Sequence, residues 1–507
     1  LLALISPGGH ADTNTAAASA EILYMTGSSV YIDAGIRDGL APGVRLVSRR
    51  NGQSDVVLEV RESSPNRSVC DVVEGSLDEL RLGDEVRFAP AVAQAGTREG
   101  QSFLQRSGLR GRVGVRYLAT RNASTDTGEF SQPALDLRLD GPSLFGSAWS
   151  VFADVRARRT TRTTEDGADE SDTRNRVYRL TIGWDKPDLG WRIAFGRQVS
   201  PDLANVSVFD GVLVGYDRER WSTGLFSGSQ PDAVDYGISS DIREHGAFFR
   251  WNAASTTAHR WMLTAGAVAS YEDSEINREF VFLIGRYAGP RFRVYLTQEV
   301  DVNRGWKKDA GESSISSTST FIVLRARLSD ELQLVGGYDN RRNIRLYRDR
   351  TTPETQFDDA FRRGVWLGAD CMAGPHLRLG VSGRTYRGGD AGAADSFTGT
   401  VGLRRLTRRN LALHLRSTRY ENDRIEGWLH SLSASIELSE AFRLGIQGGT
   451  RNDDSLVNSD LNDSVVWYGV DIDVDLTKHL YLTLAAERSR GDFEEVDQLY
   501  ATLACRF

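Results

Sequence analysis

Residues 291–300 of the chain are R-F-R-V-Y-L-T-Q-E-V. Phe292, Val294 and Leu296 occupy every second position, and mostly polar residues fill the positions between them. Because successive side chains of a β-strand point to opposite faces, this period of two predicts a strand with one apolar face and one polar face. The solvent that meets the apolar face decides what kind of β protein this is.

The same alternation continues with little interruption over residues 111–507. It is clear in L-D-L-R-L-D (135–140), V-F-A-D-V-R-A-R (151–158) and H-L-Y-L-T-L-A-A-E (479–487), whereas helical spacing is hardly visible. Short polar turns alternate with longer loops, such as those expected at 161–172, 303–314 and 451–463. Counting between these connections predicts about 22 antiparallel strands, within a range of 16 to 22. An even number places both ends of the sheet on the same side.

Composition excludes several classes of protein. The chain has 507 residues, of which 26% are charged, and a formal net charge of -7. No stretch approaches the roughly 20 apolar residues of a membrane helix, and no basic run suggests nucleic-acid binding. The three cysteines, Cys70, Cys371 and Cys505, are far apart and predict neither a disulfide framework nor a metal site.

A sheet of this length needs a way to hide its edges and its apolar face. A soluble meander would break into several domains, yet no second linker is visible. In lipid, closure of the sheet pairs every backbone group and leaves one face against hydrocarbon and one against water. The prolines agree, because Pro142, Pro187, Pro290 and Pro375 all fall in short turns and none interrupts a predicted strand. The sequence therefore predicts an all-β protein with a large transmembrane β-barrel over residues 107–507.

The last eleven residues, D-Q-L-Y-A-T-L-A-C-R-F, alternate in the same way and finish on an aromatic. This segment resembles the C-terminal strand by which porin-like bacterial outer-membrane β-barrels are recognised for insertion. The resemblance implies a membrane-insertion signal at Leu499, Leu503 and Phe507. It also implies location in the outer membrane of a Gram-negative-type bacterium, with the barrel-insertion machinery, outer-membrane lipid and lipopolysaccharide as partners.

Aromatic residues flank several of the predicted connections. Such residues at strand ends are expected of the girdles that mark the two membrane interfaces. The predicted interfacial aromatics are Trp184, Trp191, Tyr216, Trp221, Trp251 and Trp261.

The region before residue 107 has a different pattern. Residues 1–11, L-L-A-L-I-S-P-G-G-H-A, are expected to be the remainder of a secretory signal peptide, and the Ala/Gly/Gln-rich residues 91–106 are expected to form a linker. Between them, residues 21–90 hold five short β-type runs with V-Y-I-D-A-G, D-G-L, G-V-R-L and L-G-D-E-V. These motifs resemble the SH3-like modules of bacterial envelope proteins, which implies a small periplasmic β domain able to dock a protein partner.

Charged residues gather on the face that is predicted to line the lumen. The functional interpretation is a water-filled pore whose arginines favour anionic or zwitterionic solutes. The structural interpretation is that paired charges hold the walls together. The lumen-facing candidates are Arg138, Arg156, Arg158, Arg179, Arg293, Arg325, Arg327, Asp471, Asp473 and Asp475.

No motif for catalysis or for a cofactor was found. D-I-D-V-D (471–475) resembles the start of a calcium loop, but the glycine and glutamate of such a loop are missing, so we expect a strand and no metal site. No G-x-S-x-G, H-E-x-x-H or phosphate-binding loop occurs, although a hydrolase assembled from separate strands stays open.

The leading functional hypothesis is a porin-like outer-membrane channel for passive diffusion of small solutes, with no cofactor, no enzymatic activity and no nucleic-acid partner. The alternative is a structural anchor, in which the barrel holds a periplasmic module that docks an export, secretion or envelope assembly.

Overall fold

The chain forms two compact units, Leu1–Gln101 and Ser102–Phe507. The expected signal-peptide remainder (1–11) and linker (91–106) lie outside the residues that the structure describes. The computed structural model describes residues 18–25, 29–35, 40, 43–48, 56–64, 67–75, 80, 84–88, 107–122, 129–164, 167–203, 206, 208–253, 259–352, 361–389, 392–493 and 495–507.

The first unit is a small closed β-barrel, as predicted. Its strands are β1 (Ala18–Met25), β2 (Val30–Ile32), β3 (Arg45–Ser48), β4 (Val56–Ser64), β5 (Arg67–Glu74) and β6 (Glu85–Phe88), in the spatial order β1-β2-β5-β4-β3-β6. The five predicted runs missed β1, whose sequence A-S-A-E-I-L-Y-M alternates poorly. This strand pairs with both β2 and β6, so it is the element that closes the barrel.

The interior of the small barrel is apolar. Val30, Ile32, Leu46, Leu58 and Cys70 are each 0% exposed and belong to one cluster. This unit therefore folds around a dry core of its own.

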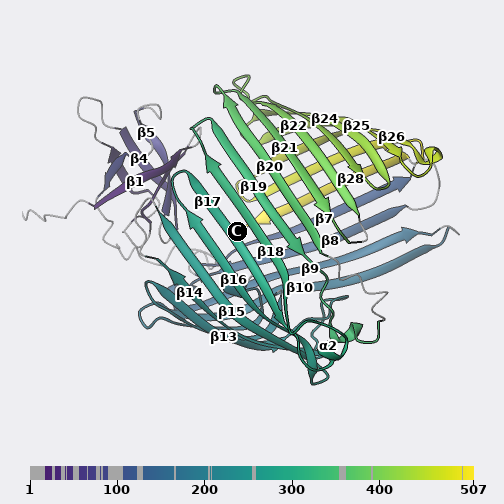
Figure 1. Ribbon diagram of the computed structural model, residues 1–507. Coiled ribbons are helices and arrows are strands. Elements are labelled where there is room, and N and C mark those ends of the chain that lie inside the picture. The colour runs from purple at the N-terminus through teal and green to yellow at the C-terminus, as the bar shows by residue number, and fades with distance from the viewer. Residues whose placement is uncertain are drawn as a thin grey trace, which may run out of the picture. The chain divides into compact units, whose positions relative to one another are not determined.

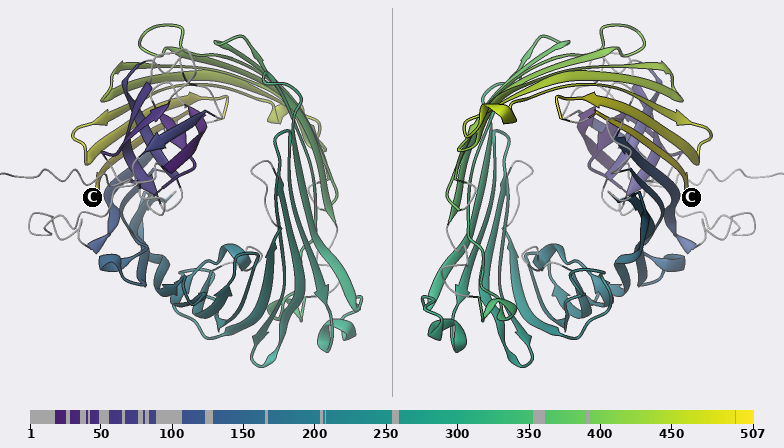
Figure 2. Two further views of the ribbon diagram at one scale, coloured as in Figure 1. Left: turned by 90° about the vertical axis from the view of Figure 1, so that its left-hand side faces the viewer. Right: turned by 90° about the vertical axis from the view of Figure 1, so that its right-hand side faces the viewer.

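The second unit is a closed antiparallel barrel of the 22 described strands β7 to β28, as the alternation predicted. Figure 1 shows these strands inclined and side by side, and Figure 2 shows the ring that they form. The first eleven are β7 (Arg110–Asn122), β8 (Phe130–Gly141), β9 (Trp149–Thr163), β10 (Asp169–Lys186), β11 (Trp191–Gln198), β12 (Phe209–Asp217), β13 (Trp221–Ser229), β14 (Ile242–Asn252), β15 (Arg260–Glu272), β16 (Glu275–Ala288) and β17 (Phe292–Val302). The others are β18 (Ile315–Arg327), β19 (Leu332–Arg341), β20 (Arg362–Ala373), β21 (Leu377–Arg387), β22 (Ala393–Leu403), β23 (Ala412–Asn422), β24 (Ile425–Ser439), β25 (Phe442–Ser455), β26 (Asp463–Asp475), β27 (Leu480–Arg490) and β28 (Glu495–Arg506).

The seam of the large barrel joins β28 to β7. Eleven residues of each strand are in register, and Phe507 extends the seam by exchanging two backbone hydrogen bonds with Gly111, of 2.9 and 3.0 Å. The start of β7 and the end of β28 thus lie at the same end of the barrel.

The connections between strands alternate between the two ends of the barrel, and their lengths depart in places from the predicted pattern of short turns at one end and long loops at the other. We call the end with connections such as 187–190, 289–291 and 440–441 the short-connection end, and the other the long-loop end. Two predicted loops were too long, because the strands continue into them. The 161–172 loop shrinks to 164–168 and the 451–463 loop to 456–462.

The helices with described bounds are short and belong to connections. They are η4 (Leu144–Gly146), η5 (Pro201–Leu203), α2 (Trp306–Asp309), η6 (Tyr347–Asp349) and η8 (Ser459–Leu461). In the described part of the chain, no helix is long and apolar enough to cross a membrane.

Side chains on strands two apart identify the inner face. On the concave side of a closed sheet such side chains converge, whereas on the convex side they diverge. Arg112 on β7 donates to Tyr481 on β27 over 3.3 Å, and Arg278 on β16 donates to Thr318 on β18 over 3.4 Å. The polar positions therefore face inward. The alternate positions face outward and carry aliphatic side chains that are 50 to 65% exposed, including Val115, Leu135, Ile182, Leu225, Leu367 and Leu432.

The charged inner wall as candidate functional site

All ten predicted lumen residues lie on the inner face, in three groups. Arg138, Arg156, Arg158 and Arg179 lie on β8 to β10. Arg293, Arg325 and Arg327 lie at the short-connection end of β17 and β18, where Arg293 directly opposes Arg325. Asp471, Asp473 and Asp475 alternate along β26, and Arg443 on β25 pairs with Asp473.

The densest group of positive charge is on β9 and β10. We call it the β9–β10 arginine cluster: Arg156, Arg158, Arg174, Arg176 and Arg179. The register places Arg158 directly opposite Arg174 and Arg156 directly opposite Arg176. Like charges that face each other across two strands destabilise a sheet. Arg174 and Arg176 were not among the predicted lumen residues, although their alternation in T-R-N-R was a signal that could have identified them.

Carboxylates offset part of this charge. Asp136 on β8 forms ion pairs with Arg156 at 2.5 Å and with Arg116 at 3.5 Å. Arg174 pairs with Asp172 at 2.5 Å. By contrast, Arg158 and Arg179 form no ion pair with any described residue, and the buried Nε atoms of Arg158, Arg176 and Arg179 have no hydrogen-bond partner there. The cluster therefore keeps an excess of positive charge toward the lumen.

The connection 230–241 folds back onto this cluster. The Cζ atom of Arg176 lies 5.1 Å from the centroid of the Tyr236 ring. The centroids of the Tyr236 and Tyr178 rings are 5.5 Å apart. Arg176 also donates to the carbonyl of Val234 over 2.9 Å. Because Arg176 is an inward residue, this contact places the connection on the lumen side of the wall.

Local hydrogen bonds fix the shape of that connection. The Asp232 carboxylate accepts the backbone N–H groups of Val234 and Asp235, and these bonds lower the pKa of Asp232. Arg197, which is 5% exposed, pairs with Asp210 at 2.6 Å and donates to the carbonyls of Tyr236 and Gly237. Neither contact is visible from the sequence, since both depend on how a loop returns to the barrel wall.

Described residues of a second connection, which joins β11 to β12, also pack on the inner face. Asp202 of η5 is 4% exposed at its side chain and bridges Arg192 on β11 and Arg250 on β14, each at 2.6 Å. Leu203 beside it is fully buried against an inner apolar patch. That patch consists of Phe209, Leu213, Phe226, Phe248, Val268, Phe280, Phe282 and Ile284. The lumen wall is thus partly apolar, which the alternation did not predict.

A third part of the wall is a compact ionic network near the long-loop end. Arg278 on β16 pairs with Glu299 at 2.5 Å and with Asp301 at 2.8 Å. Lys307 of α2 is 1% exposed, and burial lowers its pKa. The ion pairs of Arg278 fit the structural interpretation, in which charges hold strands together.

The predicted interfacial aromatics all lie at the short-connection ends of β10 to β15. Trp191, Tyr216 and Trp221 form a row with ring centroids 4.9 and 5.7 Å apart, and Trp221 directly opposes Trp251. Trp261 instead packs on Tyr287, and Trp184 opposes Trp149. Their role at a membrane interface stays a prediction.

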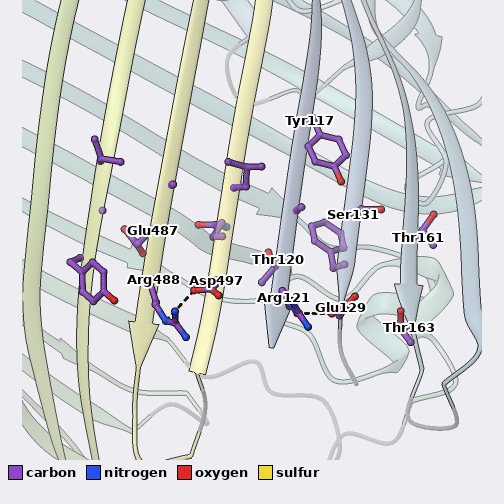
Figure 3. Close-up of a pocket in the computed structure, with 18 of the residues that line it drawn as sticks. Tyr117, Thr120, Arg121, Glu129, Ser131, Thr161, Thr163, Glu487, Arg488 and Asp497 are labelled. Atoms are coloured by element: carbon purple, nitrogen blue, oxygen red, sulfur yellow. Dashed lines mark ion pairs between the residues drawn. The ribbon is translucent and has the colours of Figure 1, made fainter. Parts of the chain in front are cut away.

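At the long-loop end, the outer face changes from apolar to polar. Along β7, outward positions are apolar from Gly111 to Ala119, and Arg121 follows. Around it lies a groove of about 890 Å³, lined by β7–β9 and β25–β28. Figure 3 shows its two ion pairs, Arg121 with Glu129 at 3.0 Å and Arg488 with Asp497 at 3.3 Å. The apolar stretch matches the about 9 to 11 residues that a tilted strand needs to cross a bilayer.

The predicted insertion signal lies on the outer face of the seam. Leu499 and Leu503 are 47% and 44% exposed. The ring of Phe507 occupies the space beside Gly111, where a Cβ would come within 2.6 Å of the ring. The structure places these residues together but does not test recognition by insertion machinery.

In the described part of the chain, no group of three or more His, Cys, Asp or Glu side chains is arranged to hold a metal ion. Asp471, Asp473 and Asp475 accordingly continue a strand.

Comparison with solved structures identifies the fold. The ferric enterobactin receptor PfeA of Pseudomonas aeruginosa, solved as a mutant, matches with a TM-score of 0.50 and 10% identity, over 79% of this chain and 81% of the receptor. The translocation pore of the P pilus usher PapC matches with a TM-score of 0.38 and 9% identity, over 78% of this chain and 99% of the other. OpdQ of Pseudomonas aeruginosa matches with a TM-score of 0.39 and 9% identity, over 79% and 98%. No protein-family model and no curated protein sequence matches.

The large unit therefore has the fold of bacterial outer-membrane β-barrels, as the sequence predicted. At these identities the likeness extends to the fold alone.

Proposed function

We propose that this chain is an outer-membrane channel through which small anionic solutes diffuse. The fold supports membrane insertion, because the outer face of the barrel is aliphatic and the inner face is charged. The observation that carries the proposal is the β9–β10 arginine cluster, in which two arginines of β9 lie directly opposite two arginines of β10.

These pairs are unfavourable for folding, so a structural role explains them poorly. Cross-strand like charges cost up to about 1 kcal/mol each relative to neutral pairs. Asp136 and Asp172 offset two of the five charges, and the remaining guanidinium groups face the lumen. Rings of arginine along a pore attract anions and repel cations.

Planar-bilayer recording of the purified full-length chain tests the proposal. Under a potassium chloride gradient, we expect single-channel currents whose reversal potential lies closer to the equilibrium potential of chloride than to that of potassium. In the double variant Arg158→Gln/Arg174→Gln, the reversal potential should move toward that of potassium. Arg419→Gln is the matched control, since Arg419 pairs with Glu426 on the outer face. Absence of current from correctly folded protein would reject the channel.

The second candidate, a structural anchor, is favoured by the small barrel, which has a closed sheet and an apolar core of its own. Here the small unit docks a protein partner, and its periplasmic placement belongs to this proposal. Cross-linking in intact cells, compared between the wild type and a variant with an unfolded small barrel, separates the two functions. An anchor should lose its cross-links in that variant, whereas a channel should keep its conductance.

A further inference from the structure

A cavity of about 770 Å³ lies at the short-connection end of the large barrel, between β13 and β17. Four arginines line it, and we call them the mouth arginines: Arg220, Arg260, Arg286 and Arg293. Arg260 opposes Ala288, Arg286 opposes Tyr295, and Arg293 opposes Arg325. All these positions share the inner face, whereas Trp261, Tyr287 and Val294, at outward positions of the same strands, also line the cavity, so the cavity spans the rim of the wall.

The mouth arginines have no acidic partners in the described part of the chain. None of their guanidinium groups forms an ion pair or a hydrogen bond there, although Arg286 stacks over the Tyr295 ring at 5.4 Å. Among the described lining residues, Glu219 is the one acid. Four positive charges and one negative charge leave a formal charge of +3 in one cavity.

Other arginines on the same wall have acidic partners, as expected of a structural role. Arg278, on the strand that carries Arg286, is held by both Glu299 and Asp301. Arg192 and Arg250 likewise share Asp202. Because guanidinium groups stay protonated in proteins, four of them without acidic partners around one cavity give it a positive potential that favours an anion.

We propose that the mouth arginines bind a soluble oxyanion that carries two or more charges, of which phosphate and pyrophosphate are the simplest. The planar fork of arginine matches the oxygens of a phosphate group and forms paired, charge-assisted hydrogen bonds with it. A singly charged anion offsets one of the three charges, whereas pyrophosphate offsets nearly all of them. The proposal rests on the proposed function, because it names the class of solute that the lumen selects.

Three of the four arginines occupy inward positions, which favours a solute over a lipid headgroup as the anion. Trp261 and Tyr287 occupy outward positions of the same strands and form the outer rim of the cavity. Arg260, Arg286 and Arg293 alternate with them and point inward.

Calorimetric titration of pyrophosphate into the full-length chain tests the site directly. The protein is kept in a non-ionic detergent at low salt, so that no phospholipid competes. We expect saturable binding that weakens as salt is added. The double variant Arg286→Gln/Arg293→Gln should weaken binding at least about tenfold, as expected for the loss of charged hydrogen bonds. Arg419→Gln should bind as the wild type does, and acetate should bind far more weakly than pyrophosphate.

Bilayer recording of the same proteins separates the two proposals. If the channel conducts and pyrophosphate reduces the chloride current of the wild type but not of the double variant, both stand. If pyrophosphate binds in solution but no variant conducts, the site stands and the channel falls. If the channel conducts but pyrophosphate neither binds nor blocks, or if the double variant binds unchanged, the site is overturned. Heat-modified mobility on gels confirms that each variant has folded.

Discussion

The two barrels of this chain are built alike and filled in opposite ways. Both are closed antiparallel sheets with every described neighbour paired. In the small barrel, Leu58 and Val30 point inward and are 0% exposed. In the large barrel, aliphatic residues such as Leu225 point outward with 65% exposure, and arginines point inward. Closure of the backbone is therefore independent of which face is apolar.

The difference follows from barrel size and from the solvent outside. A barrel of six strands is narrow enough for its own side chains to fill, so apolar residues belong inside. A barrel of 22 strands is too wide to fill in this way, so its apolar residues need hydrocarbon outside. The same alternating pattern thus predicts a strand in both units, but not which face is wet.

A charge placed inside the small barrel should have the largest effect. Leu58→Arg puts a cation into the apolar cluster of β4, where no described residue can pair with it. Burial of an unpaired charge costs more than the few kcal/mol that stabilise a small domain. We expect limited proteolysis to remove the small unit from full-length protein, while the large barrel keeps its heat-modified mobility. Survival of the small unit would contradict its dry interior.

A charge placed outside the large barrel should have the next largest effect. Leu225 is at the middle of β13 and faces outward. Leu225→Arg should cost about 2 to 4 kcal/mol of unfolding free energy in lipid vesicles, as expected for arginine near the midplane of a bilayer. Val73→Arg is the matched control, because Val73 is 45% exposed on the small barrel and should tolerate the change within about 0.5 kcal/mol. Equal effects at the two sites would contradict a lipid-facing outer surface.

Much of this comparison could be predicted from the sequence, because it depends on a period of two. The large barrel, its strand number and the inward position of residues such as Arg156 and Asp473 follow from alternation alone. Missed features depend on pairings between distant segments. Arg158 faces Arg174 because the turn between β9 and β10 occupies 164–168, which sets the register of the two strands.

The sequence also did not predict that loops lie inside the lumen. The sequence 230–241 is rich in aspartate, as many solvent-exposed loops are. Its position is set by contacts with Arg176 and Arg197, which lie more than 30 residues away. The strand β1 was missed for a related reason, since its partners β2 and β6, and not its own pattern, define it.

The pH dependence of the small barrel's stability, through the thiol of Cys70, tests whether its interior differs from that of the large barrel. Burial in the small barrel, followed by the nearby charge of Asp71, raises the pKa of Cys70 from 9.0 to about 12. A raised folded-state pKa gives stability that is fully present below pH 9 and is lost as pH rises toward 12. From pH 8 to 10 we expect the small unit to lose about 1.4 kcal/mol, measured by urea unfolding of full-length protein. Cys70→Ala should remove that pH dependence, and an unchanged slope would refute a dry environment for the thiol.

Relief of like charge on the inner face of the large barrel should give the smallest effect. Arg158→Gln removes one member of the Arg158–Arg174 pair, and Arg158 has no ion pair of its own among the described residues. We expect the barrel to gain a few tenths of a kcal/mol, since like charges directly opposite destabilise a sheet. Arg156→Gln is the matched control on the same face, and it should destabilise because it breaks the 2.5 Å pair with Asp136. Urea unfolding in vesicles measures the change in unfolding free energy for each substitution. If the two changes have opposite signs, arginines on one wall serve two purposes. Arg156 then stabilises the sheet, whereas Arg158 destabilises it. If both substitutions destabilise equally, the arginines of β9 are structural and the argument for anion selectivity loses its main support.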